Sequence, residues 1–424
     1  CLSRGLGDVY KRQEFIMLSV LINAYACSPN MGSEPGMAWN WCANLANYCE
    51  LHIITEGEFR DKIEAVVPTL PQGGNLHFYY NPVSEEVRRM CWNQGDWRFY
   101  KHYRTWQYRT YEMALDIMKV YHIDVLHQLN MIGFREPGYL WKIEGIPFVW
   151  GPVDAKEKFP IAYLQDAGLK KQLFMRLKNF LTELQLKYSL RVRKTTKHAS
   201  IVVSASSESQ KSFKKYFDID SPLLNETGCY PQVYDFQDKS YKKELDLLWV
   251  GKLDFRKQLA LAIRTVAQMR NSSVKLHIVG GGDASYYQRL AEALRVGEQC
   301  VWHGAVMYDE VQCLMRKADL FFFTSVAEGT PHVVLEAIGN NLPVVCFDIC
   351  GHGDSINDKV GRKIALSNPD QSVKEFAKVL NELEADRGLL KQLSLNCHQR
   401  QEELSWDNKA KQMMELYKSC SPIV

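Results

Sequence analysis

The feature that most constrains this sequence is an alternation of short apolar runs with longer helical stretches, which occurs twice. Such runs, separated by helices, are typical of parallel strands buried on both faces. In the first half we predict strands at 18–25, 51–55, 76–80, 124–129, 147–150 and 200–205. In the second half we predict strands at 246–251, 275–279, 300–306, 319–325 and 343–348. The alternation predicts an α/β protein with two doubly wound, Rossmann-like domains.

Helical periodicity fills the intervals between the predicted strands. In the first half we predict several helices, including 36–47 and 98–121. In the second half we predict helices at 258–270, 285–297, 309–317, 332–340 and 371–396, and a separate amphipathic helix at Trp406–Ser419. A loop around 221–243, which contains Pro222, Gly228 and Pro231, marks the boundary between the two series. We therefore predict a first domain over 17–225, a second over 226–405 and a closing helix within 406–424. A length of 424 residues agrees with two large domains.

Residues 1–16 do not fit this pattern. The stretch from Cys1 to Gln13 is polar and has no helix or strand period, whereas Met17 opens an apolar strand. We expect residues 1–16 to be a foreign leader and Met17 to be the start of the protein, with a natural extension as the alternative. The leader is excluded from the fold prediction.

Charge and cysteine content exclude several classes of protein. Residues 1–225 carry 28 Lys and Arg against 23 Asp and Glu, and the remainder carries 24 against 26. This balance is too weak for a nucleic-acid-binding protein on charge alone. Twelve cysteines without a Cys-x-x-Cys pair favour reduced thiols and a cytoplasmic compartment over a disulfide framework or a zinc site. No run of 18 apolar residues predicts a membrane-spanning helix.

Two segments concentrate the basic residues of the first half. Residues 169–198 hold nine Lys and Arg against one Glu, interleaved with Leu and Phe at helical spacing, and residues 88–109 hold six against one Asp with seven aromatic residues. Basic amphipathic segments suit an anionic membrane surface, here the inner face of the cytoplasmic membrane. The alternative is a helix that packs its apolar face on the core, and both interpretations stay open.

The strongest candidate site follows the predicted strand 319–325. A helix start with a nearby glycine offers free N–H groups to an anion such as phosphate. Carboxylates on either side are suitable acceptors for sugar hydroxyls, so the arrangement suits a nucleotide sugar. The residues concerned are Glu328, Gly329, Thr330, Pro331, His332 and Glu336. The alternative is a plain strand–loop–helix unit with two solvated glutamates.

A second candidate element follows the predicted strand 246–251. Gly251 ends the strand, and Lys252, Arg256 and Lys257 precede the next helix. Lys252 and Lys257 could neutralise a diphosphate and stabilise it as a leaving group. A solvated basic loop is the alternative.

The second half resembles that of the glycosyltransferase family 4 enzymes, which have the GT-B fold, and the resemblance covers nearly the whole chain from Met17 to the end. The resemblance rests on Gly251-Lys252 with Lys257, Val279-Gly280-Gly281-Gly282, His303-Gly304, Glu328-x7-Glu336 and Cys350-Gly351-x-Gly353 in order and spacing. It implies that the two lysines contact the donor diphosphate, that Glu328 contacts the donor sugar and that Glu336 contacts the ribose. It also implies two domains facing a cleft, with the closing helix crossing back to the first domain.

The first half supplies further candidates. Gly32 lies in a glycine turn after the first strand, and similar turns face the donor phosphates in the family. Family members often carry His-x-His after strand 124–129. Here His127 is followed by Leu129, so His127 is a candidate catalytic residue beside Glu328, and a buried structural histidine is the alternative. Candidates for the acceptor side are Asn130, Arg135, Glu136 and Asp154.

The resemblance implies a retaining glycosyltransferase without a metal or other cofactor, which uses a nucleoside-diphosphate sugar as co-substrate. The acceptor would be a saccharide or lipid-linked saccharide of the cell surface. Gly280-Gly281-Gly282 is not followed by the residues of an NAD site, and Asp218-Ile-Asp220 is interpreted as surface. A nucleotide-sugar epimerase and a noncatalytic sugar-binding subunit are the alternatives.

Overall fold

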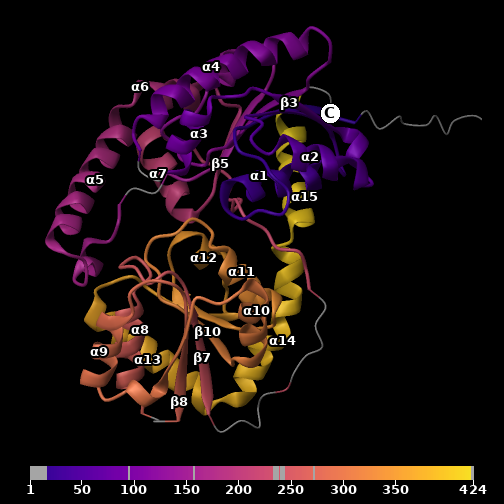
Figure 1. The fold of residues 1–424 in the computed structure, drawn as a ribbon. Coiled ribbons are helices and arrows are strands. Elements are labelled where there is room, and N and C mark those ends of the chain that lie inside the picture. Colours follow the sequence, from indigo (N-terminus) through magenta and orange to yellow (C-terminus); the bar gives the residue numbers. More distant parts are fainter. Residues whose placement is uncertain are drawn as a thin grey trace, which may run out of the picture.

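The computed structural model describes residues 17–93, 96–155, 158–232, 238, 244–270 and 273–421. The leader predicted for residues 1–16 lies outside the described residues. The chain forms two lobes, each built on a parallel sheet with helices on both sides (Figure 1). None of the helices in the described part combines the length and apolar character that a membrane crossing needs.

The first sheet has the strand order β3-β2-β1-β4-β5-β6. Its strands are β1 (Ser19–Ala24), β2 (Glu50–Thr55), β3 (Leu76–Tyr80), β4 (Val125–Asn130), β5 (Phe148–Val153) and β6 (Ile201–Ser204). The helices are α1 (Ser33–Leu45), α2 (Arg60–Val66), α3 (Glu85–Trp92), α4 (Phe99–Met118), α5 (Leu169–Tyr188), α6 (Leu190–His198) and α7 (Ser207–Phe217). In the central strand β1, Val20 pairs with Leu51 on one side and Val125 on the other. All six residues of β1 are buried, as its apolar sequence predicts.

The second sheet repeats this order as β12-β11-β10-β7-β8-β9. Its strands are β7 (Leu245–Val250), β8 (Val274–Val279), β9 (Cys300–Gly304), β10 (Leu320–Phe323), β11 (Val344–Phe347) and β12 (Gly361–Ile364). The helices are α8 (Leu259–Gln268), α9 (Ser285–Ala293), α10 (Tyr308–Lys317), α11 (His332–Gly339), α12 (Cys350–Ser355), α13 (Pro369–Ala385) and α14 (Arg387–Glu403). In each sheet the strand order reverses beside the first strand, and ligands of such sheets bind at the carboxyl ends near that point.

Five short 3-10 helices complete the described elements. They are η1 (Val67–Thr69), η2 (Gly73–Asn75), η3 (Leu140–Lys142), η4 (Ile161–Leu164) and η5 (Gly297–Gln299).

The predicted element pattern is wrong at the edge of the second sheet. The single helix predicted over 371–396 is two helices, because the side chain of Asp386 accepts a hydrogen bond from the N–H of Leu389 at 2.8 Å and starts α14. The edge strand β12 was not predicted, since its sequence Gly-Arg-Lys-Ile has no apolar run. Both errors concern the edge of the second sheet and the helices beyond it.

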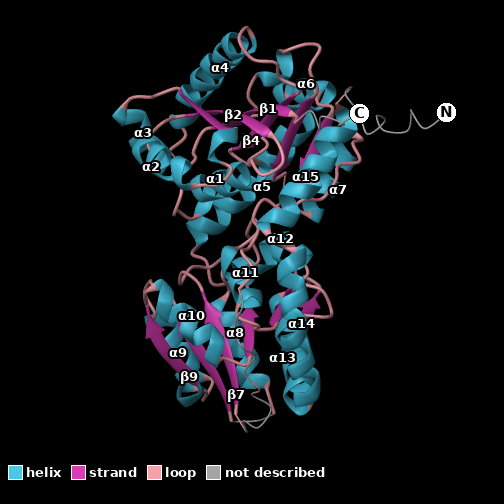
Figure 2. Ribbon diagram, turned by 90° about the vertical axis from the view of Figure 1, so that its right-hand side faces the viewer, coloured by secondary structure: helices cyan, strands magenta, loops and turns pink. Residues whose placement is uncertain are grey.

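The closing helix α15 (Trp406–Cys420) crosses back to the first domain, as the sequence predicts. It follows α14 on the second lobe and then lies against α1 on the first (Figures 1 and 2). Trp406, Met413 and Tyr417 are buried in the same apolar cluster as β1 and α1. The ring of Trp406 meets that of Trp41 edge to face, with centroids 5.7 Å apart.

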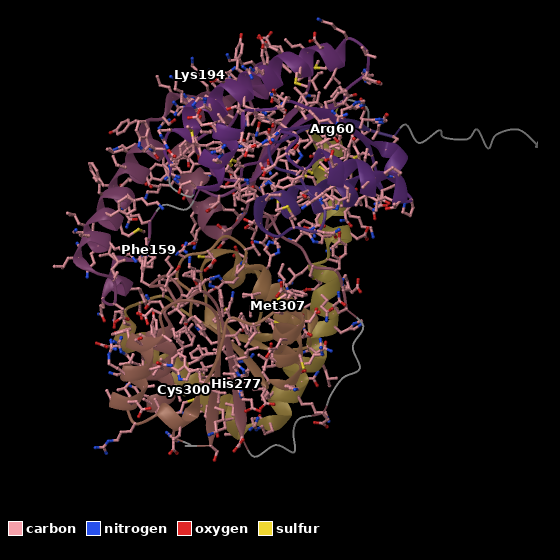
Figure 3. All side chains as sticks on the ribbon, viewed as in Figure 1. Arg60, Phe159, Lys194, His277, Cys300 and Met307 are labelled. Carbon is pink, nitrogen blue, oxygen red and sulfur yellow. The ribbon has the colours of Figure 1, made fainter. Side chains whose placement is uncertain are left out.

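A second crossing runs the opposite way. Residues 158–168, here called the strap, lie within the range predicted for the first domain but contact the second. Phe159, Tyr163 and Leu164 are buried in the apolar cluster of β7, β8 and β10. The hydroxyl of Tyr163 lies 2.7 Å from Ser372 Oγ, and its carbonyl accepts from Gln258 Nε2 at 2.8 Å. Figure 3 labels Phe159 beside α5 where the two lobes meet. Each domain therefore contributes to the core of the other.

Candidate functional site

A hollow of about 370 Å³ lies between the two domains, here called the central hollow. The first domain contributes the start of α1 and the loop after β4, and the second contributes Lys257 and the loop before α11. Its lining residues are Ser33, Glu34, Met37, Ile132, Glu226, Thr227, Lys257, Glu328, Gly329, Thr330, Pro331, His332 and Val333. The structure thus brings together Lys257 and the predicted run from Glu328 to His332.

Two further hollows adjoin the central one. The α1 hollow, of about 190 Å³, is lined by Tyr25, Ala26, Cys27, Ser33, Glu34, Pro35, Thr55, Glu56, Gly57, Glu58, Phe59, Cys91, Trp92 and Met131. The α11 hollow, of about 510 Å³, is lined by Asn40, Gly228, Cys229, Tyr230, Gln232, Tyr308, Asp309, Gln312, Arg316, His332, Leu335, Glu336, Gly339, Asn340 and Trp406. Ser33 and Glu34 line both the α1 and central hollows, and His332 lines both the central and α11 hollows. The three hollows form a row.

A cation and a carboxylate face each other in the central hollow. Lys257 Nζ lies 2.6 Å from Glu328 Oε1, which also accepts a hydrogen bond from Ser325 Oγ at 2.6 Å. Both side chains are less than one fifth exposed. Lys257 also approaches the ring of Phe323, with 5.3 Å to the centroid. These contacts hold the Lys257 ammonium group at the carboxyl end of β10, where it can bind an anionic ligand.

The N-terminal end of α11 is shaped by a close contact between two loops. Pro331 is the residue before the first helical residue, His332, and has an extended backbone. A side chain at Gly351 would place its Cβ 2.1 Å from Thr330 Oγ1, so only glycine allows this approach. Free amides and the helix dipole make such an end suitable for an anion.

A carboxylate of the protein itself occupies this end of α11. Glu226 Oε1 accepts a hydrogen bond from the N–H of Thr330 at 2.5 Å, and Oε2 accepts from Thr330 Oγ1 at 2.8 Å. Glu226 is buried, and burial raises the pKa of its carboxyl above the usual range. Sequence reasoning missed this residue, because it lies in the interdomain loop and not after a core strand.

Lys252 and Glu336, two of the predicted donor-binding residues, lie outside the central hollow, as does Gly32. Lys252 is exposed on the loop after β7. Glu336 lies on the second turn of α11 and faces the α11 hollow, where its Oε2 accepts from Gln312 Nε2 at 3.3 Å. Burial raises the pKa of the Glu336 carboxyl. Glu328 therefore lines the central hollow, whereas Glu336 lines the α11 hollow.

The predicted glycine turn lies at the start of α1. Gly32 is the residue before the helix and does not line the central hollow, whereas Ser33 and Glu34 do. Glu34 Oε1 accepts from the N–H of Ile132 at 3.2 Å, and Oε2 is buried without a hydrogen-bond partner among the described residues. Burial, with a smaller contribution from the Glu226 and Asp154 carboxylates, raises the Glu34 pKa to about 7. The turn therefore contributes a carboxyl that sequence reasoning did not single out.

His127 lies in the core, where its contacts are those expected for the structural alternative, and its catalytic role stays a prediction. It is fully buried on β4, and its Nε2–H donates to the carbonyl of Gly151. Its Nδ1 accepts from the hydroxyl of Tyr417 on α15 at 2.6 Å. With both nitrogens engaged the ring is neutral, and burial lowers the pKa of His127 to about 4. His127 lines none of the three hollows.

The four predicted acceptor-side residues have different surroundings. Asn130 is buried and donates from Nδ2 to the carbonyl of Ala26 at 2.8 Å. Glu136 is held by bidentate bonds from Arg104 and by Arg191, so it ties α4 to α6. These contacts fit structural roles instead of the predicted acceptor contacts.

Arg135 and Asp154 lie closer to the cleft. The guanidinium of Arg135 donates to Thr182 Oγ1 at 2.8 Å and to Gln185 Oε1 at 2.6 Å, both on α5. Asp154 directly follows β5, and its backbone N–H donates to the carbonyl of Ile132, which lines the central hollow. Neither side chain lines one of the three hollows.

The α1 hollow has carboxylates and aromatic rings that sequence reasoning missed. Trp92 Nε1 donates to Glu58 Oε1 at 2.9 Å, and buried Glu56 is paired with Arg88 at 2.9 Å. Phe59 meets the Trp92 ring edge to face. Because Glu56 and Glu58 directly follow β2, the rule that ligands bind at the carboxyl ends of strands could have found them.

Within the described part of the chain, no group of three or more His, Cys, Asp or Glu side chains is placed to hold a metal ion. The groups around the central hollow include Lys257, His332, the carboxyls of Glu34, Glu226 and Glu328, and the N–H of Thr330.

Comparisons with known proteins agree with this geometry. Residues 232–400 match the family described as Glycosyl transferases group 1. An uncharacterized glycosyltransferase of Methanocaldococcus jannaschii is 31% identical over 176 residues, which are 41% of this chain and 44% of that protein. The α-1,4-N-acetyl-D-galactosaminyltransferase of Campylobacter jejuni that acts on an undecaprenol-diphosphate-linked saccharide is 26% identical over 174 residues, 38% of this chain and 45% of that protein. The matches thus span less than half of these relatives.

Solved structures share the fold over nearly the whole chain. The lipopolysaccharide outer core galactosyltransferase WaaB, in its apo form, aligns with a TM-score of 0.62 at 15% identity over 95% of this chain and 99% of the other. Anabaena HepE in complex with UDP aligns with a TM-score of 0.55 at 14% identity over 95% of this chain and 100% of the other. Residues 232–400 are therefore similar to the group 1 glycosyl transferases, and the chain shares the GT-B fold with these solved structures.

Proposed function

We propose that this chain is a glycosyltransferase, which moves a sugar from a nucleoside-diphosphate sugar to a hydroxyl of a saccharide acceptor. The observation that carries the proposal is the row of three adjoining hollows, with Lys257 and Glu328 paired in the middle one. A transfer reaction needs this order of compartments: leaving group, reacting sugar and acceptor. The family of residues 232–400 and the names of the relatives support the same reaction.

In this proposal the nucleoside occupies the α11 hollow, with its ribose hydroxyls on Glu336. The diphosphate and the donor sugar occupy the central hollow, with Lys257 near the phosphates and Glu328 near the sugar. The acceptor occupies the α1 hollow, where carboxylates and aromatic rings suit sugar hydroxyls and sugar faces. Solved HepE holds UDP, which supports a nucleotide donor.

The reaction breaks the bond between the anomeric carbon and the phosphate oxygen. Lys257 and the amides at the start of α11 stabilise the charge that develops on the diphosphate. The acceptor hydroxyl attacks the anomeric carbon, and its proton passes to the departing phosphate. Glu226 accepts the hydrogen bond of the Thr330 N–H in this structure, so its side chain must move away before a phosphate can accept that bond.

We further propose membership of family 4 and retention of anomeric configuration, both on the ordered motifs from Gly251 to Gly353. We propose that no metal takes part, since Lys257 and the α11 amides can neutralise the diphosphate. The acceptor is proposed to be a lipid-linked saccharide used in cell-surface synthesis, on the cytoplasmic side of a membrane. The Campylobacter relative that acts on such an acceptor and the free thiols of the described cysteines support this placement.

The test is incubation of the chain with UDP-, GDP- and ADP-sugars, with and without saccharide acceptors, while nucleotide release is followed. Glu328→Gln keeps the shape of the side chain and removes its charge, so we expect release to fall at least about a hundredfold with the fold intact. Glu310→Gln, at an exposed residue of α10, is the matched control. Binding of a nucleotide sugar without release under any condition would support a noncatalytic subunit instead.

A further inference from the structure

Helix α5 turns its more apolar face away from the protein. The exposed residues recur at intervals of three and four, with two adjacent pairs, so they form one broad stripe along the helix. Each is between 37% and 83% exposed: Leu169, Leu173, Phe174, Leu177, Phe180, Leu181, Leu184 and Tyr188. Contiguous exposed apolar surface of this kind marks an interaction site in a soluble protein.

The buried face of α5 is the less apolar one. It consists of Met175, Asn179, Thr182 and Leu186. Asn179 exchanges two hydrogen bonds with the backbone of Phe159, at 2.8 and 2.9 Å, and Thr182 accepts from Arg135. These polar contacts fix the rotation of the helix, so the exposed stripe is a stable property of the fold.

The charges around the stripe favour an anionic occupant. α5 carries Lys170, Lys171, Arg176, Lys178 and Lys187, and the following α6 adds Arg193, Lys194 and Lys197. The one acidic residue of α5, Glu183, is already paired with Lys158 at 2.8 Å. A second copy of the chain would bring the same cations together, and like charges oppose such a contact.

The stripe also has a defined position relative to the cleft. The strap leads directly into α5, and Ala167 and Met175 belong to the core cluster of the second domain. At its other end, Leu186 belongs to a core cluster of the first domain. α5 therefore runs along one flank of the first lobe, and its N-terminal end reaches the second (Figure 1).

We propose that the exposed face of α5 binds an anionic phospholipid bilayer and lies in its surface, with the leucine and phenylalanine side chains among the acyl chains. A helix of 20 residues is about 30 Å long and would lie flat, since its basic residues flank an apolar stripe. Both domains would then be held at the membrane beside the cleft. The docking does not depend on the proposed transfer reaction, although it would bring the protein close to a lipid-linked acceptor.

The test is co-sedimentation of the full chain with vesicles of phosphatidylcholine alone and with vesicles that also contain phosphatidylglycerol. We expect binding to the anionic vesicles only. Phe174→Gln with Phe180→Gln should weaken this binding at least about tenfold, because two aromatic side chains no longer enter the apolar layer. Arg176→Gln with Lys187→Gln should weaken it about tenfold through the loss of attraction to the anionic lipid.

The matched control is Val120→Gln with Leu395→Gln, two exposed apolar residues elsewhere, which should bind as the unaltered chain does. Circular dichroism verifies that each variant is folded. Equal sedimentation of the chain and the Phe174→Gln, Phe180→Gln variant would overturn the proposal. A dimer in light scattering that this variant abolishes would also overturn it and assign the face to a second copy. Donor hydrolysis, measured without vesicles, reports separately on the proposed reaction.

Discussion

Glu226 joins the interdomain loop to the start of α11, so its charge bears directly on what can bind there. Its two hydrogen bonds to Thr330 use the donors that a phosphate would need. An ionised carboxylate at that point also repels an incoming diphosphate. The Glu226 carboxylate therefore competes with an incoming phosphate for the N–H and the hydroxyl of Thr330.

Glu226→Gln should bind a nucleoside diphosphate at least about tenfold more tightly, because one negative charge leaves the central hollow. The measurement is calorimetric titration with UDP, GDP and ADP. Glu208→Gln is the control, since Glu208 makes a similar interdomain bond, to the N–H of Cys350 at 3.1 Å, outside the central hollow. Weaker nucleotide binding in Glu226→Gln would mean that Glu226 is itself a donor ligand.

Glu34 should make stability depend on pH. Its pKa rises from 4.5 to about 7 on folding, so between these values the folded chain holds more protons than the unfolded chain. The free energy of unfolding therefore falls as pH rises through this window and stays at the lower value above it. Glu34→Gln removes this pH-dependent decrease in the free energy of unfolding. Its melting temperature should exceed that of the unaltered chain above about pH 7 and approach it below about pH 5, and parallel melting curves across this range would contradict the assignment.

At the scale of elements, α15 is tied to β4 through a buried hydrogen bond between Tyr417 and His127. Tyr417→Phe leaves Nδ1 of His127 buried without a donor and should reduce the free energy of unfolding by about 1–3 kcal/mol. The rate of nucleotide release should stay within about twofold, because both residues lie outside the three hollows. Chemical denaturation and the release assay measure the two quantities, and a rate loss beyond the stability loss would restore the catalytic interpretation of His127.

The elements themselves could be predicted well from periodicity, because the central strands are continuous apolar runs such as Leu320–Phe323. The start of the helix after β10 and the charged residues beside it could also be predicted, because they directly follow a predicted strand of a parallel sheet. The inward face of α5 could not be predicted, since Asn179 and Thr182 turn the helix through partners distant in the sequence. Glu226 was equally hidden, because its role depends on the approach of two domains and not on a local pattern.

For the whole molecule, the strap and α15 make the two domains dependent on each other. Tyr163→Ala should destabilise the second domain by about 3–5 kcal/mol, because the ring packs on Phe347 and the hydroxyl bonds to Ser372. Amide hydrogen exchange should quicken in β10 and β11 more than in β1 and β2. Tyr188→Ala, which removes an exposed ring, should change exchange little. Equal acceleration in both sheets would show that the two domains unfold as one unit.

The strap also bears on the order in which the protein is made. Tyr163 leaves the ribosome 209 residues before Ser372, which at about 5–20 residues per second corresponds to roughly 10–40 s. During that time Phe159, Tyr163 and Leu164 have no second domain to cover them, and the apolar face of α5 follows directly. The nascent first half is therefore an aggregation-prone intermediate. A chain interrupted before residue 372 would expose the apolar side chains of the strap and the adjoining apolar face of α5 together.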